Sequence, residues 1–172
     1  MKSGLLVCQF SATAGVSAAL LRYMQGKARI EHVDLVIPRA VALRYCNALQ
    51  PVPLTGYGLL GARFSGGVQL RPANYDKFTR IVRKGCIVPD IDAAYRFAFA
   101  QIGKPYDKGA ILDFILDRRR PFTPERPEWF CDEFAYTAFW QGGKLLLDCE
   151  NPLNLTPEEM MLSPDLKIQQ GA

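Results

Sequence analysis

The sequence predicts an α+β fold in which a small antiparallel sheet packs against helices. Two patterns carry this prediction: the first half of the chain holds short apolar or alternating segments typical of strands, and the half after Pro89 shows helical periodicity. The chain has 172 residues, and because one domain spans roughly 150 residues, we expect a single domain over residues 1–172.

Four segments of the first half are expected to form the strands. An apolar run lies near the N-terminus, an alternating run follows, and two further runs joined by Ser-Gly-Gly are expected to form a hairpin. A return strand is also expected near the C-terminus. The expected strands are 4–10, 32–37, 56–64, 67–71 and 145–147.

The alternating run separates apolar from polar side chains. Val33, Leu35 and Ile37 share one face, which we expect to lie in the core. His32 and Asp34 therefore point to the opposite face, where they are available to line a cleft.

Helices are expected mainly in the second half. The clearest one follows Asp90, a good N-cap, and a second begins at Cys131 and closes at a Gly-Gly pair. A short one follows Thr156, whose Thr-Pro-Glu-Glu sequence has the form of a capping box. The expected helices are 16–24, 90–103, 109–116, 131–140 and a short segment after 156.

Composition limits the chemistry that the chain can perform. There is one histidine, so a histidine-dependent enzyme must use His32 as its base. The net charge of +4 comes without a dense Lys/Arg run typical of nucleic-acid binding. Five cysteines without a CxxC pair form neither a complete disulfide framework nor a zinc knuckle, which favours a reducing, cytoplasmic location, with export as the alternative. No segment has the apolar length of a membrane span.

Cys131 is the candidate nucleophile because it stands at the expected start of a helix. Unpaired N–H groups and the positive end of the helix dipole stabilise a thiolate there and can also hold an oxyanion. Asp132 and Glu133 act against this by raising the pKa of the thiol, unless they face away or pair with arginines. The alternative for Cys131 is a buried core cysteine.

Two sets of segments resemble a known family. Residues 102–107, which include Gly-Lys-Pro-Tyr, and 129–134 resemble the cysteine half of NlpC-type cell-wall peptidases. Residues 31–36, 59–63 and 66–70 resemble their histidine half. Because the histidine comes first, the order resembles the circularly permuted branch, which is papain-like and includes lecithin:retinol acyltransferase-like proteins and bacterial or phage amidases. The resemblance covers Leu5 to Ser163.

The resemblance implies a cysteine peptidase or amidase that needs no metal or cofactor. Cys131 would attack a carbonyl carbon, His32 would be the base, and Tyr106 with the Asp132 backbone N–H would stabilise the oxyanion. The family places a polar group on the strand after the histidine, but residues 60–63 offer no acceptor, since Arg63 only donates. Gln69 or Asp34 is the substitute, or the site is a dyad.

Three functions follow as alternatives from these residues. The first is amide hydrolysis, with a peptide of cell-wall type as the expected substrate. The second is thioester or lipid acyl transfer through the same intermediate, and the third is a non-catalytic binding domain of papain-like shape. The sequence predicts neither the oligomeric state nor the pathway.

Overall fold

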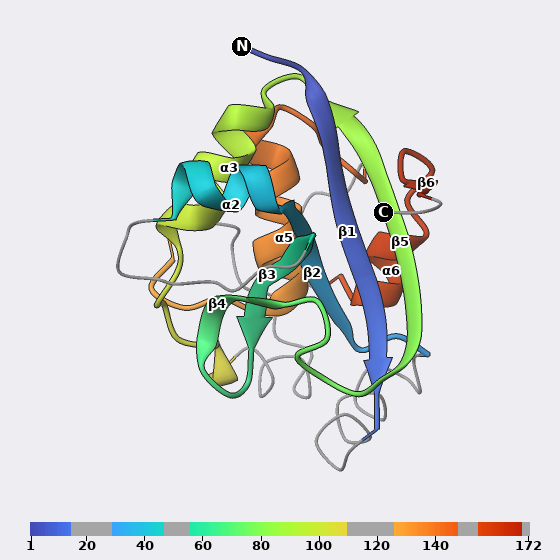
Figure 1. Cartoon of the computed structure of the whole chain (residues 1–172). Coiled ribbons are helices and arrows are strands. Elements are labelled where there is room, and N and C mark those ends of the chain that lie inside the picture. The colour runs from blue at the N-terminus through green and yellow to red at the C-terminus, as the bar shows by residue number, and fades with distance from the viewer. Residues whose placement is uncertain (15–28, 47–55, 110–125, 148–154, 170–172) are drawn as a thin grey trace.

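The computed structural model describes residues 1–14, 29–46, 56–109, 126–147 and 155–169. Within these residues one antiparallel sheet has the strand order β4-β3-β2-β1-β5-β6 (Figure 1). The strands are β1 (Gly4–Thr13), β2 (His32–Pro38), β3 (Tyr57–Arg63), β4 (Gly67–Pro72), β5 (Phe78–Val88) and β6 (Lys167–Ile168).

The helices gather on one face of this sheet. Helix α5 contacts β2, β3 and α3, and α6 contacts β1 and α5. The connection from β4 to β5 runs across the other face (Figure 1). The helices are α2 (Arg39–Tyr45), α3 (Ile91–Ala100), α5 (Cys131–Gln141) and α6 (Pro157–Met161). The predicted α+β class with an antiparallel sheet is therefore confirmed.

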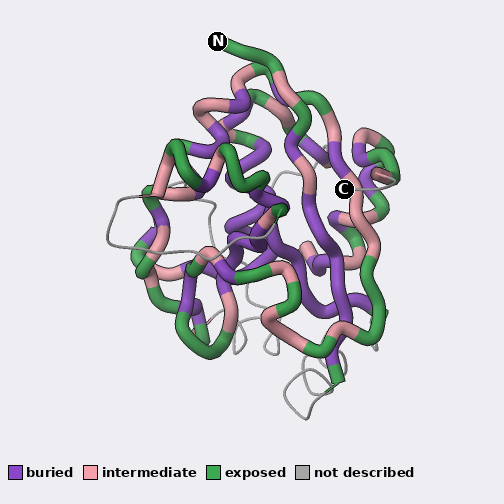
Figure 2. The backbone as a smooth tube through the Cα atoms, in the orientation of Figure 1, coloured by how far each residue is buried: buried purple, intermediate pink, exposed green. Residues whose placement is uncertain are grey.

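The core lies between the sheet and α5. Phe10, Val33 and Leu35 lie on one face of neighbouring strands and belong to the same apolar cluster as Phe134 of α5. Figure 2 shows the central strands and α5 almost continuously buried. Burying large side chains such as these contributes about 1.5–3 kcal/mol each, so α5 is fixed firmly against β2.

The elements with the strongest local signals form as predicted. Asp90 caps α3 by accepting a hydrogen bond from the Ala93 N–H at 3.0 Å. Strands β3 and β4 form the expected antiparallel hairpin, with Gly66 and Gly67 at positive φ in the turn. Thr156 caps α6, and its hydroxyl accepts from the Glu159 N–H at 3.1 Å.

Strand β1 is longer than predicted because its polar residues alternate with core residues. The prediction ended the strand at Phe10, before Ser11 and Thr13. In the structure Gln9, Ser11 and Thr13 are all buried, on the face opposite Phe10. Polar residues mark a strand end only when that face is exposed, and here it is covered.

Strand β5 was missed, and the expected strand 145–147 does not form. The β5 sequence carries Arg80, Arg83 and Lys84 and leaves much of the strand exposed, which hides the apolar alternation. Residues 145–147 follow a turn at Gly143, which has a φ of 82°, and Ser163 donates a hydrogen bond to the Leu146 carbonyl. The Leu146 carbonyl therefore accepts from a side chain and not from a neighbouring strand.

The expected helix 16–24 and nearly all of 109–116 lie outside the described residues. Of the helices within the described residues, none combines the length and the apolar character that crossing a membrane requires.

Candidate active site

Helix α5 places Cys131 at its first position, as predicted. The preceding segment is held by residues 105–107: the Trp129 N–H donates to the Pro105 carbonyl at 3.1 Å, and the Asp107 N–H donates to the Trp129 carbonyl at 3.0 Å. This short parallel bridge joins Tyr106 to the residue two positions before Cys131. The start of α5 therefore comes together with Tyr106.

The Cys131 thiol lies against the backbone of β2. The side chain is buried, and the backbone N–H groups of Val33 and Asp132 lie near enough to its sulfur to favour a thiolate. Burial raises the pKa of Cys131 well above its usual value, the Asp132 carboxyl raises it further, and the two N–H groups oppose both effects. The resting side chain is consequently a neutral thiol.

His32 begins β2, one residue before the Val33 N–H that contacts the thiol. Its Nε2 lies 3.0 Å from Oδ1 of Asp34, although neither atom has a partner aligned as a hydrogen bond. Because side chains alternate along a strand, His32 and Val33 point to opposite faces of the sheet. The pairing of β2 with β3 runs from Leu35 to Pro38. The first residues of β2 are nevertheless buried, and Gly61 of β3 lies next to Asp34.

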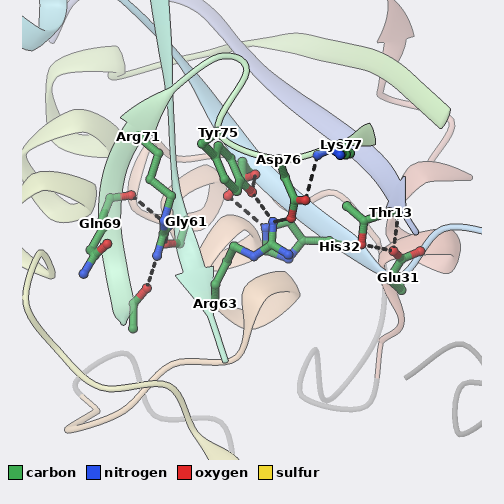
Figure 3. A network of polar contacts seen from close by, with 12 residues as sticks. Thr13, Glu31, His32, Gly61, Arg63, Gln69, Arg71, Tyr75, Asp76 and Lys77 are labelled. Carbon is green, nitrogen blue, oxygen red and sulfur yellow. Dashed lines mark hydrogen bonds and ion pairs between the residues drawn. The ribbon is translucent and has the colours of Figure 1, made fainter. Parts of the chain in front are cut away.

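Asp34 is the centre of a buried polar network, and Figure 3 shows the residues around it, among them His32, Arg63 and Tyr75, lying close together. Tyr75 donates to its Oδ2 at 2.8 Å, and Arg63 donates to the Tyr75 oxygen at 2.8 Å. Burial alone would raise the pKa of Asp34, but His32, Tyr75 and Arg71 together lower it below its usual value. Asp34 is therefore a buried carboxylate that stays ionised next to the imidazole.

The acidic pair after Cys131 divides into two environments. Glu133 forms a buried ion pair with Arg126, with 2.5 Å between Oε2 and Nη1. Asp132 instead accepts from the Glu133 N–H at 2.8 Å, and burial followed by the Glu133 charge raises its pKa well above its usual value. One of the two acidic residues is thus paired with an arginine, while the other favours its neutral form.

Tyr106 and Gln69 occupy different surroundings. Tyr106 is buried, packs against the Phe130 ring with 5.3 Å between centroids, and has a pKa raised well above its usual value by burial, then by Cys131. Gln69 is exposed on β4, and its side chain lies over Gly66 in the hairpin turn. Of the two suggested third residues, Asp34 is the one that contacts the His32 ring.

Sequence reasoning missed Tyr75, Arg71 and Arg126. Tyr75 lies in the connection between β4 and β5. Arg71 donates hydrogen bonds to the Gly61 and Gly67 carbonyls at 3.0 and 2.9 Å. No local pattern distinguishes these residues from surface residues, because their partners come from other strands. The buried carboxylate of Asp34 is the only signal, since such a group needs donors.

Comparisons with known proteins give a fold relationship. No family model matches the chain, and no curated protein matches it. A solved structure, that of the DUF1105 metalloprotein YiiX from Escherichia coli O157:H7, superimposes with a TM-score of 0.60 at 12% identity, covering 99% of this chain and 97% of that one. At this identity the likeness concerns the fold alone.

The resemblance to circularly permuted NlpC-type peptidases is therefore wrong as a family assignment. The structural neighbour is a protein of another family, DUF1105, and no family model or curated protein supports the peptidase or a peptidoglycan substrate. The resemblance rested on short elements, a Gly-Lys-Pro-Tyr turn and a cysteine that opens a helix. In this fold Tyr106 of the first element pairs with Trp129 and joins two segments of the core.

Proposed function

We propose that this protein is a cysteine-dependent hydrolase of amide bonds, with Cys131 as nucleophile and His32 as base. The observation that carries the proposal is the contact between the Cys131 sulfur and the Val33 N–H, because it joins the start of α5 to the residue that follows the only histidine. The proposal includes a papain-like arrangement, in which a cysteine opening a helix works with a histidine on the sheet.

His32 is suited to accept the thiol proton. Because Nε2 faces the ionised Asp34, the ring favours a proton on Nε2 and a free lone pair on Nδ1. His32 directly precedes Val33, whose backbone N–H lies near the thiol. In the proposed reaction Nδ1 removes the proton from Cys131 as the sulfur attacks the substrate carbonyl carbon.

The rest of the reaction follows from the same groups. The backbone N–H groups of Cys131 and Asp132, with the Tyr106 phenol, stabilise the oxyanion of the tetrahedral intermediate. His32 then gives its proton to the leaving amine, and the carbonyl remains on sulfur as a thioester. Water, deprotonated by His32, hydrolyses the thioester, which releases a carboxylic acid and restores the thiol.

The raised pKa of Cys131 supports a second candidate, a non-catalytic binding domain. Cys131 is a buried neutral thiol beside a carboxyl, and a cysteine with a purely structural role has the same properties. The two candidates differ in one property: a catalytic Cys131 loses its proton to His32, and a structural Cys131 does not.

A metal-dependent reaction has less support in this chain, although the structural neighbour is a metalloprotein. Across the described ranges, no three or more His, Cys, Asp or Glu side chains converge as a metal site would require. His32 and Asp34 alone supply too few ligands for such a centre, and the other Asp34 oxygen, Oδ2, accepts from Tyr75.

Competition between two cysteines tests the proposal. Cys8 is the matched control, because it is buried like Cys131 and its pKa is likewise raised by burial. With iodoacetamide at neutral pH and peptide mass spectrometry, we expect Cys131 to react about a hundredfold faster than Cys8, the lower end of what a positioned base contributes. In His32→Ala the Cys131 rate should fall to that of Cys8. Equal rates for the two cysteines, unchanged in His32→Ala, would exclude the hydrolase and leave the binding domain.

Intact-mass spectrometry identifies the substrate class. Activated amide, ester and thioester substrates are mixed with the full chain, and the acyl group is located by digestion. Acylation confined to Cys131, absent in Cys131→Ser and retained in Cys8→Ser, is the expected result. Rapid release to water indicates a hydrolase, whereas release only to an added amine or alcohol indicates an acyltransferase.

A further inference from the structure

The Asp34 network includes a residue that the proposed reaction does not use, Tyr75 in the connection between β4 and β5. Tyr75 is largely buried, and its ring lies between two guanidinium groups, 5.0 Å from Arg63 and 5.5 Å from Arg71. Its edge packs on Phe78 at 5.3 Å and 88°. Arg63 is held in turn by Asp76, with 2.7 Å between Nη1 and Oδ2. These contacts leave the phenol one orientation, with its oxygen directed at Asp34.

The direction of the hydrogen bonds around Tyr75 is fixed by counting protons. A phenol has one proton, and a guanidinium only donates. Because Arg63 Nη1 donates to the Tyr75 oxygen, the phenol proton must go to Asp34 Oδ2. Burial, followed by the Asp34 charge, raises the pKa of Tyr75 far above its usual value, so the phenol remains a donor at any ordinary pH. Oδ1 is then the oxygen left for His32.

Gly61 makes room for this arrangement. A Cβ at position 61 would overlap Oδ1 of Asp34. The carboxylate therefore lies directly over the β3 backbone, with one oxygen facing Tyr75 and the other His32. Few orientations of the carboxylate satisfy both neighbours.

We propose that Tyr75, held by Arg63, is a positioning residue for His32: it anchors Asp34 so that the carboxylate holds the imidazole with its proton on Nε2 and its lone pair on Nδ1. This inference deepens the proposed function and rests on it for its catalytic meaning. The positioning itself is a property of the folded chain and can be measured without a substrate.

Nitrogen-15 NMR of the full chain measures the tautomer of His32 directly, since the chain has one histidine and couplings to the two ring C–H protons distinguish Nδ1 from Nε2. We expect wild type to show a protonated Nε2 and an unprotonated Nδ1. Tyr75→Phe removes one hydroxyl and should shift both resonances toward a mixture of tautomers. Tyr57→Phe is the matched control, because Tyr57 also pairs with an arginine, Arg83, but does not contact Asp34.

A second variant and a second measurement keep the outcomes distinct. Arg63→Gln removes the donor to the Tyr75 oxygen and should give a smaller shift of the same kind, which covers the case that Tyr75→Phe does not fold. We also expect iodoacetamide labelling of Cys131 in Tyr75→Phe to be roughly tenfold slower, with the rate of Cys8 unchanged.

His32 resonances that coincide with wild type in both variants would overturn the positioning role. Shifted resonances in a protein whose wild-type Cys131 reacts no faster than Cys8 would uphold the positioning of the ring and overturn only the hydrolase.

Discussion

Asp34 and Asp132 are both buried carboxyl groups near Cys131, yet their pKa values move in opposite directions. Asp34 accepts a hydrogen bond from the Tyr75 phenol and lies beside His32 and Arg71, so its pKa is lowered although burial opposes this. Asp132 accepts backbone N–H groups next to the charge of Glu133, and burial raises its pKa. Burial is the same in both regions, and the partners decide the protonation state.

This difference assigns separate tasks to the two sides of β2. The side under the β4–β5 connection keeps a charge next to the imidazole, which fixes a tautomer. The side at the start of α5 favours neutral groups around the thiol, so the sulfur loses its proton only when a base is placed to take it. Variants that exchange or remove these environments test the comparison.

The largest effect is expected from Asp34→Ala. The change leaves the Tyr75 hydroxyl without its acceptor and Arg71 without a nearby opposite charge, and removing one member of a buried charged pair costs about 3–5 kcal/mol of unfolding free energy. Because the pKa of Asp34 is lowered in the fold, its contribution is present above its unfolded pKa, about 3.9, and is lost as the pH falls through the lower folded value. Urea unfolding at several pH values should show the variant and wild type converging in acid.

Asp76→Ala is the control for that measurement. Asp76 belongs to the same network through Arg63, but it is partly exposed. An ion pair of this kind contributes about 0–1 kcal/mol, so the variant should unfold close to wild type. Equal losses for Asp34→Ala and Asp76→Ala would show that the network acts as a surface charge cluster and that burial of Asp34 has no special effect.

The sequence predicted the helices around this site better than it predicted the network. Asp90 and the apolar period after it specify α3, and Cys131 with the Gly-Gly pair bounds α5, because caps and helical periodicity are local. Asp34 was correctly placed with His32 on one face of a strand, since alternation is also local. Tyr75 could not be predicted, because its role comes from a contact 41 residues away along the chain.

The same limit explains the strand errors. The prediction ended β1 before Ser11 and Thr13 because they are polar, but both are buried on a covered side of the sheet. Whether a polar residue is exposed or buried depends on the β4–β5 connection and on neighbouring strands, which a single segment does not encode. The contact of Cys131 with Val33 likewise depends on how α5 packs on β2.

A smaller effect is expected from Gly61→Ala, which alters the position of Asp34 and keeps its charge. The new Cβ overlaps Oδ1, so the carboxylate must shift from the position in which it contacts His32. Overpacking of this kind costs about 1–3 kcal/mol. The double variant with Asp34→Ala removes the overlapping atom, so the two losses should not add. Additive losses in urea unfolding would show that residue 61 acts through the backbone and not through Asp34.

The smallest effect, with the opposite sign, is expected from Asp132→Asn. The pKa of Asp132 is raised in the fold, so the folded chain holds a proton that the unfolded chain releases above about pH 3.9. The wild-type carboxyl therefore lowers stability as the pH rises above that value. An amide of the same shape keeps the acceptor for the Glu133 N–H and carries no charge. Asp132→Asn should therefore stabilise the protein at neutral pH.

The sign of this effect separates the two regions most directly. Asp34→Asn is the matched change on the other side of β2, and it should destabilise the protein at neutral pH because the lost charge is a favourable one. Both differences should disappear in acid, where the carboxyl groups of the unfolded chain are also protonated. Destabilisation by both variants at neutral pH would show that Asp132 is ionised in the fold, and Cys131 would then begin α5 beside a permanent negative charge that opposes formation of its thiolate.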